Sequence, residues 1–288
     1  MFHRSAAPFT PLKELRNMAN NSSLSKRAAL RQQQEMEERT KRTRRILAVG
    51  AGLAALTIVA VLAIVIMQAL AKQAPVATEQ LTPPNATASS GIALAGKQPQ
   101  EGTPHLVVWE DFQCPACASR EESYGPIIEQ LVADGSITAE IRTAFFLDAG
   151  LRNDSSKRAA LAAAAADEVG AFDAFHRVVY ANHPAQEGTG FTDQQLRVDF
   201  PALAGIEGED LTRYQELYDT RAFNDFTDAA NQKFNDDQIG ATPTFLVSGQ
   251  VLEFYDQESQ TVLIQPTTES LLGAISEAFE AGGQQLES

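Results

Sequence analysis

An uncharged run of 26 residues, positions 46–71, divides the chain into two unequal parts. Its most apolar stretch, residues 46–67, would extend about 33 Å as a helix, because each helical residue adds about 1.5 Å. That length covers the hydrocarbon core of a bilayer, which is about 30 Å thick. The run is apolar on every face, whereas a helix at the surface of a globular core is amphipathic. We therefore expect a single transmembrane helix over residues 46–71.

The charges differ in sign on the two sides of this run. Residues 1–72 hold 12 Lys and Arg against 4 Asp and Glu, and the rest of the chain holds 11 against 33. A basic cluster at residues 41–45 comes directly before the run and favours a cytoplasmic N-terminus. This division indicates two compartments rather than nucleic-acid binding. We expect a single-pass cell-membrane protein with its larger part outside.

The segments around the span have distinct compositions. Residues 1–45 form a basic cytoplasmic tail, residues 72–90 are rich in Pro, Ala, Thr and Ser and predict a flexible tether, and residues 91–282 form the globular domain. Ala69 and Ala71 have the small-x-small form of a signal-peptide cleavage site, so cleavage after Ala71 is the alternative to an anchor. The 45-residue head is long for a signal peptide and favours the uncleaved anchor.

The globular part begins with a strand, a helix and a strand. Residues 106–109 are a short apolar run, Pro115 starts a helix, and residues 137–147 alternate as a second strand. This order predicts a parallel pair with a right-handed crossover. Helices follow at 155–168, which opens on a capping serine, at 171–180, after a capping box at 192–195, and within 211–235. Strands at 244–247 and 251–255, joined by a turn at 248–250, precede a last helix at about 268–279.

The chain has only two cysteines, Cys114 and Cys117. A disulfide between them would close a very small loop and stabilise the fold little, so their use must be chemical. Cys114 lies where the helix begins, and the unpaired N–H groups and helix dipole there favour a thiolate. Pro115 suits the first helical position because it has no N–H to leave unpaired. We assign Cys114 as the nucleophile and Cys117, one turn on, as the resolving cysteine.

Half of a zinc site is the alternative use of a Cys-x-x-Cys pair. It would need two more Cys or His ligands at suitable spacing. No other cysteine is present, and His105, His176 and His183 show no ligand pairing in the sequence. We therefore expect no metal and no cofactor other than the redox-active cysteine pair.

A proline stands directly before the strand at 244–247. The sequence there is Gly240-Ala241-Thr242-Pro243. Such a proline can simply mark an edge strand. The sharper interpretation is a cis bond between Thr242 and Pro243, which leaves room beside the cysteines for the backbone of a substrate.

Three segments together resemble the DsbA-like proteins of the thioredoxin superfamily. Residues 109–117 resemble their active-site stretch, residues 171–182 their inserted helix, and residues 240–247 their cis-proline strand. The resemblance covers about residues 91–281 and, with an uncleaved N-terminal anchor, is to the membrane-anchored actinobacterial type. It implies an α/β thioredoxin-like fold with a helical domain inserted at about 152–236, preceded by the transmembrane helix.

The resemblance also implies partners and site residues. The substrates would be exported proteins with thiols or disulfides, and a DsbB- or VKOR-like membrane protein would reoxidise the cysteines. Pro115 and Ala116 would be the dipeptide between the cysteines, with Thr242 and Pro243 as the substrate-binding loop beside them.

Two positions depart from the family pattern. Strong oxidases of the family carry histidine where this chain has Ala116, and many relatives carry a buried acid where it has Val108. Glu110 and Asp111 lie nearby, but strand alternation points them to opposite faces, so at most one is expected to face the core. For either carboxylate, a solvated or capping role is the alternative.

These features predict an extracytoplasmic thiol–disulfide oxidoreductase that forms or exchanges disulfide bonds in exported proteins. A lowered pKa at Cys114 would make the disulfide oxidising, although Ala116 predicts a milder oxidant than the strongest relatives. A reductase or isomerase, for example in cytochrome c maturation, is the alternative within redox chemistry. A non-enzymatic extracytoplasmic binding module is the alternative outside it.

Overall fold

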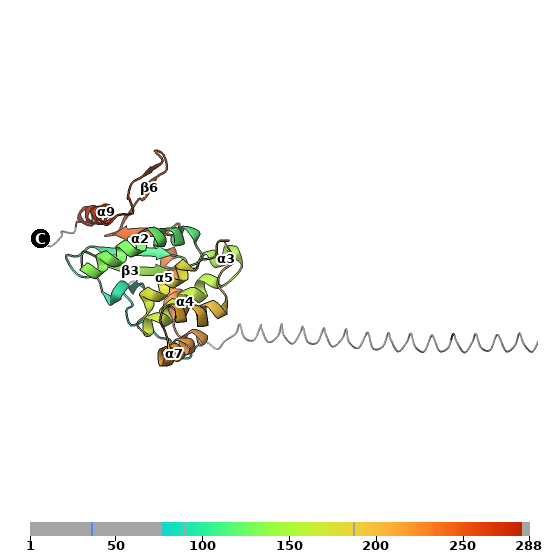
Figure 1. Cartoon of the computed structure of the whole chain (residues 1–288). Coiled ribbons are helices and arrows are strands. Elements are labelled where there is room, and N and C mark those ends of the chain that lie inside the picture. The colour runs from blue at the N-terminus through green and yellow to red at the C-terminus, as the bar shows by residue number, and fades with distance from the viewer. Residues whose placement is uncertain (1–35, 37–76, 89, 187, 284–288) are drawn as a thin grey trace, which may run out of the picture. The chain divides into compact units, whose positions relative to one another are not determined.

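The computed structural model describes residue 36 and residues 77–88, 90–186 and 188–283 (Figure 1). The chain divides into a first unit, Met1–Gln73, and a second unit, Ala74–Ser288. The predicted membrane span at 46–71 lies outside the described residues. None of the helices within the described ranges combines the length and the apolar character that crossing a membrane requires.

A five-stranded sheet forms the centre of the second unit. Its strand order is β1-β3-β2-β4-β5, and the strands are β1 (Ile92–Ala93), β2 (His105–Glu110), β3 (Thr138–Thr143), β4 (Thr244–Val247) and β5 (Gln250–Val251). β2 and β3 are parallel, with His105 opposite Thr138 and Glu110 opposite Thr143. The other three pairings are antiparallel. The predicted parallel pair is thus confirmed, with β4 on the other side of β2.

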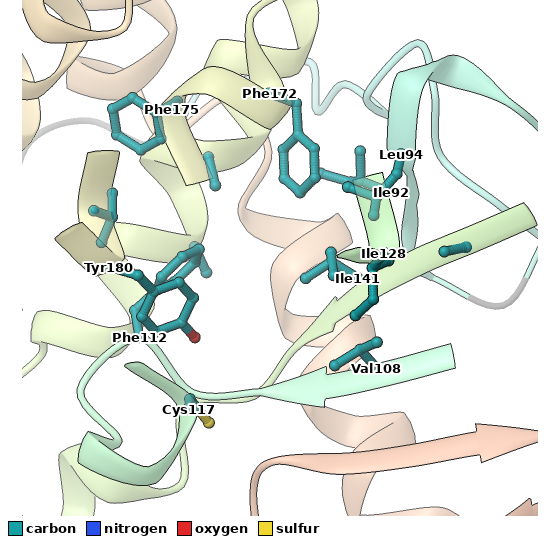
Figure 2. Close-up of a cluster of buried hydrophobic side chains, with 14 of the residues drawn as sticks. Ile92, Leu94, Val108, Phe112, Cys117, Ile128, Ile141, Phe172, Phe175 and Tyr180 are labelled. Carbon is teal, nitrogen blue, oxygen red and sulfur yellow. The ribbon is translucent and has the colours of Figure 1, made fainter. Parts of the chain in front are cut away.

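Both faces of β2 are covered by apolar side chains, and each face belongs to a separate apolar cluster. Leu106 and Val108 join the main core, part of which is shown in Figure 2. Trp109 packs on the other face against Phe234, with the ring centroids 5.6 Å apart. A central strand between two cores is held on both sides, so its carboxyl end is a fixed platform for the residues that follow.

Helix α2 (Pro115–Asp134) starts at this carboxyl end and packs back over the sheet. Its inner face buries Ile128, Leu131 and Val132. Gly135 ends it in the left-handed region at φ 82°, which suits glycine because no Cβ is strained there. The Lys97 ammonium donates to the carbonyls of Val132 and Ala133 in the last turn, where a positive charge favours the helix dipole.

Helices fill the chain between β3 and β4. They are α3 (Leu147–Leu151), α4 (Ser155–Glu168), α5 (Phe172–Ala181), the π-helical turn η2 (Gln195–Asp199), α6 (Phe200–Leu203), α7 (Gly208–Asp219) and α8 (Asn224–Asp236). Figure 1 shows α4, α5 and α7 gathered below the sheet. Five consecutive alanines of α4, residues 162–166, are fully buried. Their small side chains let the neighbouring helices approach closely, which makes α4 the centre of this layer.

The structure confirms one of the two predicted helix caps between residues 137 and 195, and it differs from the prediction at the other cap and at the end of the strand. The capping box at Thr192 and Gln195 is confirmed by its two reciprocal backbone–side-chain bonds. The predicted strand at 137–147 ends at Thr143, and residue 147 begins α3 instead. The predicted serine cap of α4 is wrong, because Asp154 occupies the cap position and the Ser156 hydroxyl donates to Asp111.

Residues 77–88 differ from the flexible tether that their composition predicts. Backbone N–H groups of Ala77 and Leu81 donate to carbonyls of Thr220 and Ala222, beside α7. Further along, the side-chain amide of Asn85 donates to Asp167 at 2.9 Å. These bonds hold the segment against the helical layer, so it belongs to the folded unit.

The C-terminal part also departs from the expected pattern. β4 and β5 form the expected hairpin, but the predicted strand at 251–255 is split. Tyr255–Asp256 forms β6, which pairs with β7 (Thr261–Val262) in a separate two-stranded ribbon. Helix α9 (Thr268–Ala281) then closes the fold, with the Thr267 hydroxyl accepting from the Ser270 N–H as its cap.

Candidate redox site

Cys114 occupies the cap position of α2, directly before Pro115. The chain leaves β2 at Glu110 and turns over three residues, and the Cys114 N–H donates to the Asp111 carbonyl at 2.9 Å. Pro115 and Ala116 are exposed, Cys114 is almost covered, and Cys117 is fully buried. The two cysteines are not joined by a disulfide, so the pair is in its reduced state. One sulfur therefore lies at the surface of the helix start and the other lies beneath it.

The two thiols differ in acidity. The Cys117 thiol, which donates to the Cys114 sulfur, contributes most to lowering the pKa of Cys114. Burial opposes this effect, while Thr242 and the backbone N–H groups of Ala116 and Cys117 add to it, and the pKa settles at about 6. Burial raises the pKa of Cys117 well above its ordinary value, and the charge of Glu110 raises it further. At neutral pH the pair therefore holds one thiolate and one thiol.

The loop before β4 lies against Cys114. The Thr242–Pro243 peptide bond is cis, as the sequence predicts. The Cys114 sulfur lies 3.3 Å from the Thr242 carbonyl oxygen, to which its thiol donates. The buried Thr242 hydroxyl has no hydrogen-bond partner within the described residues, which leaves it able to donate to the thiolate. The structure thus brings residues 114 and 242 together from opposite ends of the domain.

A network of buried polar side chains supports the turn before Cys114. The Gln113 amide nitrogen lies 2.8–2.9 Å from oxygens of Asp148, Asn153 and Ser156. Asp111 accepts from the Ser156 hydroxyl and from the backbone N–H of Gln113. Burial raises the pKa of Asp111 to about 6 against these hydrogen bonds, which lower it. The turn is therefore tied to the start of α4.

Glu110 and Asp111 are both buried, so the expectation that at most one faces the core is wrong. The alternation ends with the strand at Glu110, and the turn directs Asp111 inward as well. Glu110 lies 2.7 Å from His176 of α5, Oε2 to Nε2, and the other imidazole nitrogen lies 3.6 Å from Glu121 of α2. The sequence alone predicts no partner for His176.

These three side chains are the one group in the described residues whose potential ligand atoms converge as a metal site would require. Nε2 of His176, however, is hydrogen-bonded to Glu110, and Nδ1 lies 3.6 Å from Glu121, an ion-pair distance rather than a hydrogen bond. Burial alone would lower the pKa of His176, but the charges of Glu110 and Glu121 outweigh it and raise the pKa to about 9. The geometry therefore describes an imidazolium between two carboxylates.

A family model described as Thioredoxin matches residues 99–265, more than half of the chain. No curated protein matches the chain by sequence. Solved structures do match, and because their sequence identities are 20% or lower for the structures given next, the likeness shows a shared fold alone.

Three examples have TM-scores between 0.50 and 0.54. MdbA, a thiol-disulfide oxidoreductase from Corynebacterium diphtheriae, is 20% identical with a TM-score of 0.50, and the match covers 61% of this chain and 91% of that one. MdbA from Actinomyces oris is 15% identical with a TM-score of 0.54, covering 71% and 96%. BdbD from Bacillus subtilis, in its oxidised form, is 16% identical with a TM-score of 0.53, covering 70% and 100%.

Proposed function

Because this chain belongs to the thioredoxin family, we propose that it is a protein thiol–disulfide oxidoreductase that forms or exchanges disulfide bonds through Cys114 and Cys117. The thioredoxin-like fold with inserted helices, expected from the sequence, is confirmed. The MdbA structures that share this fold are described as thiol-disulfide oxidoreductases. The observation that carries the proposal is the opposite acidity of the two thiols, about 6 for the pKa of Cys114 and well above the ordinary value for Cys117.

This asymmetry assigns a role to each sulfur. In the oxidised enzyme a substrate thiolate attacks Cys114 Sγ, and the Cys114–Cys117 bond breaks with its electron pair passing to Cys117, which takes up a proton. A second substrate thiolate then displaces Cys114, which leaves as a stable thiolate. Thr242 and Pro243 would hold the backbone of the substrate beside the sulfur, since their loop already contacts Cys114.

The direction of the reaction follows from the same acidity. A low pKa stabilises the thiolate of the reduced enzyme, and a stabilised reduced form makes the disulfide a better oxidant. Ala116 does not supply the cation that a histidine would add there. We therefore place this enzyme on the oxidising side, as a milder oxidant than relatives with histidine at that position.

The proposed location is outside the cell membrane. The uncharged run at 46–71 would be the anchor, the basic residues before it would stay in the cytoplasm, and the acidic domain would face exported proteins. A DsbB- or VKOR-like membrane protein is the proposed reoxidising partner.

Trapping the cysteines in living cells tests both activity and direction. Acid quenching followed by alkylation should find Cys114 and Cys117 mostly oxidised. A mostly reduced pair would favour the reductase or isomerase instead.

A Cys117→Ala variant should accumulate mixed disulfides with exported proteins, since the resolving thiol is missing. The matched control is Cys114→Ala with Cys117→Ala, which should trap none. If the single variant also traps none, the non-enzymatic binding module becomes the better description.

A further inference from the structure

His176 lies where the inserted helices meet the platform that carries the cysteines. It lies on α5 between Phe172 and Tyr180, which are one turn away on either side and are labelled in Figure 2. Its side chain is 4% exposed, and so is that of Glu110. The nearby cavity is only about 10 Å³, room for one water at most. Solvent therefore screens the charges in this cluster only weakly, and they interact more strongly than charges at the surface.

Charged groups face His176 from three elements. Glu110 comes from β2 and Glu121 from α2. Asp173, on α5 itself, accepts from the Ala95 N–H, and its charge raises the pKa of His176 less than theirs. Arg120 of α2 lines the same cavity, with its guanidinium lying over the Phe254 ring. His176 is the cation hydrogen-bonded to Glu110 in the described part of the chain.

The cluster lies close to the sulfurs. Glu121 follows Cys117 by four residues in α2, so the two share one face of that helix. Glu110 precedes Cys114 by four residues across a tight turn. Tyr180, whose ring is 5.0 Å from that of His176, packs on Phe112 and donates to the Asp111 carbonyl. The charge of Glu110 contributes to the raised pKa of Cys117, so charge in the cluster acts on the cysteine pair.

We propose that His176 is a positioning residue for the redox reaction, an imidazolium that offsets Glu110 and so helps the site to hold the Cys114 thiolate. The inference rests on the proposed function. The inserted helices then take part in the redox reaction, because they supply His176 from α5, whereas both cysteines lie at the start of α2.

The charge balance of one catalytic round explains why this cation matters. The enzyme disulfide and two substrate thiols become a substrate disulfide, a Cys117 thiol and a Cys114 thiolate, and one proton goes to solvent. The site thus gains one negative charge on reduction. With His176 protonated, Glu110, Glu121 and His176 carry a net charge of −1. Without it the two carboxylates would carry −2 and disfavour the thiolate.

The test is the glutathione redox equilibrium of the folded protein at pH 8, together with the thiolate titration of Cys114. His176→Gln keeps a hydrogen-bond donor for Glu110 but removes the cation. We expect it to shift the equilibrium constant fivefold to tenfold toward the disulfide, where tenfold is about 30 mV for this two-electron couple. The pKa of Cys114 should rise with it.

A double variant separates charge from packing. Glu110→Gln with His176→Gln restores the net charge of −1, so its equilibrium constant should return to within about twofold of wild type. Glu121→Gln alone should shift the constant the other way, toward the dithiol. This variant also decides the matter if His176→Gln fails to fold, because Glu121 is the least buried of the three.

The histidine control is His105→Gln at the opposite end of β2, expected to leave the constant within twofold. An unchanged constant in folded His176→Gln, a double variant displaced as far as the single one, or no shift in Glu121→Gln would each overturn the inference. A wild-type protein that does not exchange with glutathione would instead count against the proposed function.

Discussion

The two ends of strand β2 each carry a histidine–glutamate pair, and the pairs differ in what surrounds them. At the amino end, His105 Nε2 lies 3.6 Å from Glu140, and its Nδ1 lies 2.8 Å from the Thr138 hydroxyl. Glu140 also pairs with the Arg142 guanidinium. At the carboxyl end, Glu110 pairs with His176 at 2.7 Å.

The difference lies in which group supplies the positive charge. Burial would raise the pKa of Glu140, but hydrogen bonds and the charges of Arg142 and His105 bring it below its ordinary value. The amino end therefore has a guanidinium beside its carboxylate and does not depend on an imidazole alone. At the carboxyl end the charge belongs to an imidazole and can be lost. One pair is therefore structural, and the other responds to the reaction beside it.

The largest expected difference between the two ends is in stability. His176→Ala removes one partner of a fully buried pair and should lower the free energy of unfolding by about 3–5 kcal/mol. His105→Ala loses a hydrogen bond at a side chain that is 21% exposed and should cost about 1 kcal/mol. Urea unfolding of both reduced variants at pH 7 measures this, and equal losses would remove the distinction.

The pH dependence of stability should also separate the ends. The pKa of His176 is raised to about 9 from an ordinary 6.5. The protonated His176 therefore stabilises the folded state fully below pH 6.5, and this contribution is lost as the pH rises through 9. The loss in the free energy of unfolding is up to about 3 kcal/mol. Unfolding should be followed in a Cys114→Ser background, since that thiolate stabilises with the opposite sign. His176→Gln should flatten the curve and His105→Gln should not.

A smaller effect concerns the thiolate itself. Alkylation of Cys114 should reach half its maximal rate near pH 6. Thr242→Val keeps the side-chain shape but removes the hydroxyl, and it should raise that midpoint by about half a unit to one unit, the contribution of one hydrogen bond. Thr244→Val, at the start of β4 where the hydroxyl bonds the Ala241 carbonyl, is the control and should leave the midpoint unchanged.

The smallest effect belongs to the far end of α2. Lys97→Met removes the ammonium that binds the carbonyls of Val132 and Ala133. It should cost about 0.5–1 kcal/mol in thermal or urea unfolding. The Cys114 titration should not move, because the cysteines lie at the other end of the helix. A moved titration would mean that the two ends of the domain are coupled.

Much of the fold can be predicted because its signals are local. Alternation or apolar runs indicate β2 and β4, and Pro115 indicates the start of α2. β3 ends at Thr143, earlier than its pattern suggests, and the chain turns into α3 at Phe146, which stacks on Phe234 with 5.2 Å between the ring centroids. That contact joins residues 88 positions apart, which no short window of sequence contains.

The candidate site divides in the same way. Cys114 and Cys117 are found from their spacing, and Thr242 from its proline. Glu110 and His176 are 66 residues apart, and their pairing depends on how α5 docks. The sequence does indicate that His176 is buried. It lies one turn after Phe172 and one turn before Tyr180, on the apolar face of the helix. A histidine on that face is buried and needs a polar partner.

The bonds around Gln113 have a consequence for the speed of exchange. They fix the residue before Cys114 to Asp148, Asn153 and Ser156 in the reduced form. The turn is therefore preorganised, and little of the backbone has to rearrange as bonds shift between sulfur atoms. The entropy of aligning Cys114 for in-line attack is lost during folding rather than at each encounter. A substrate then meets a rigid sulfur, and the motion that alignment requires must come from the substrate.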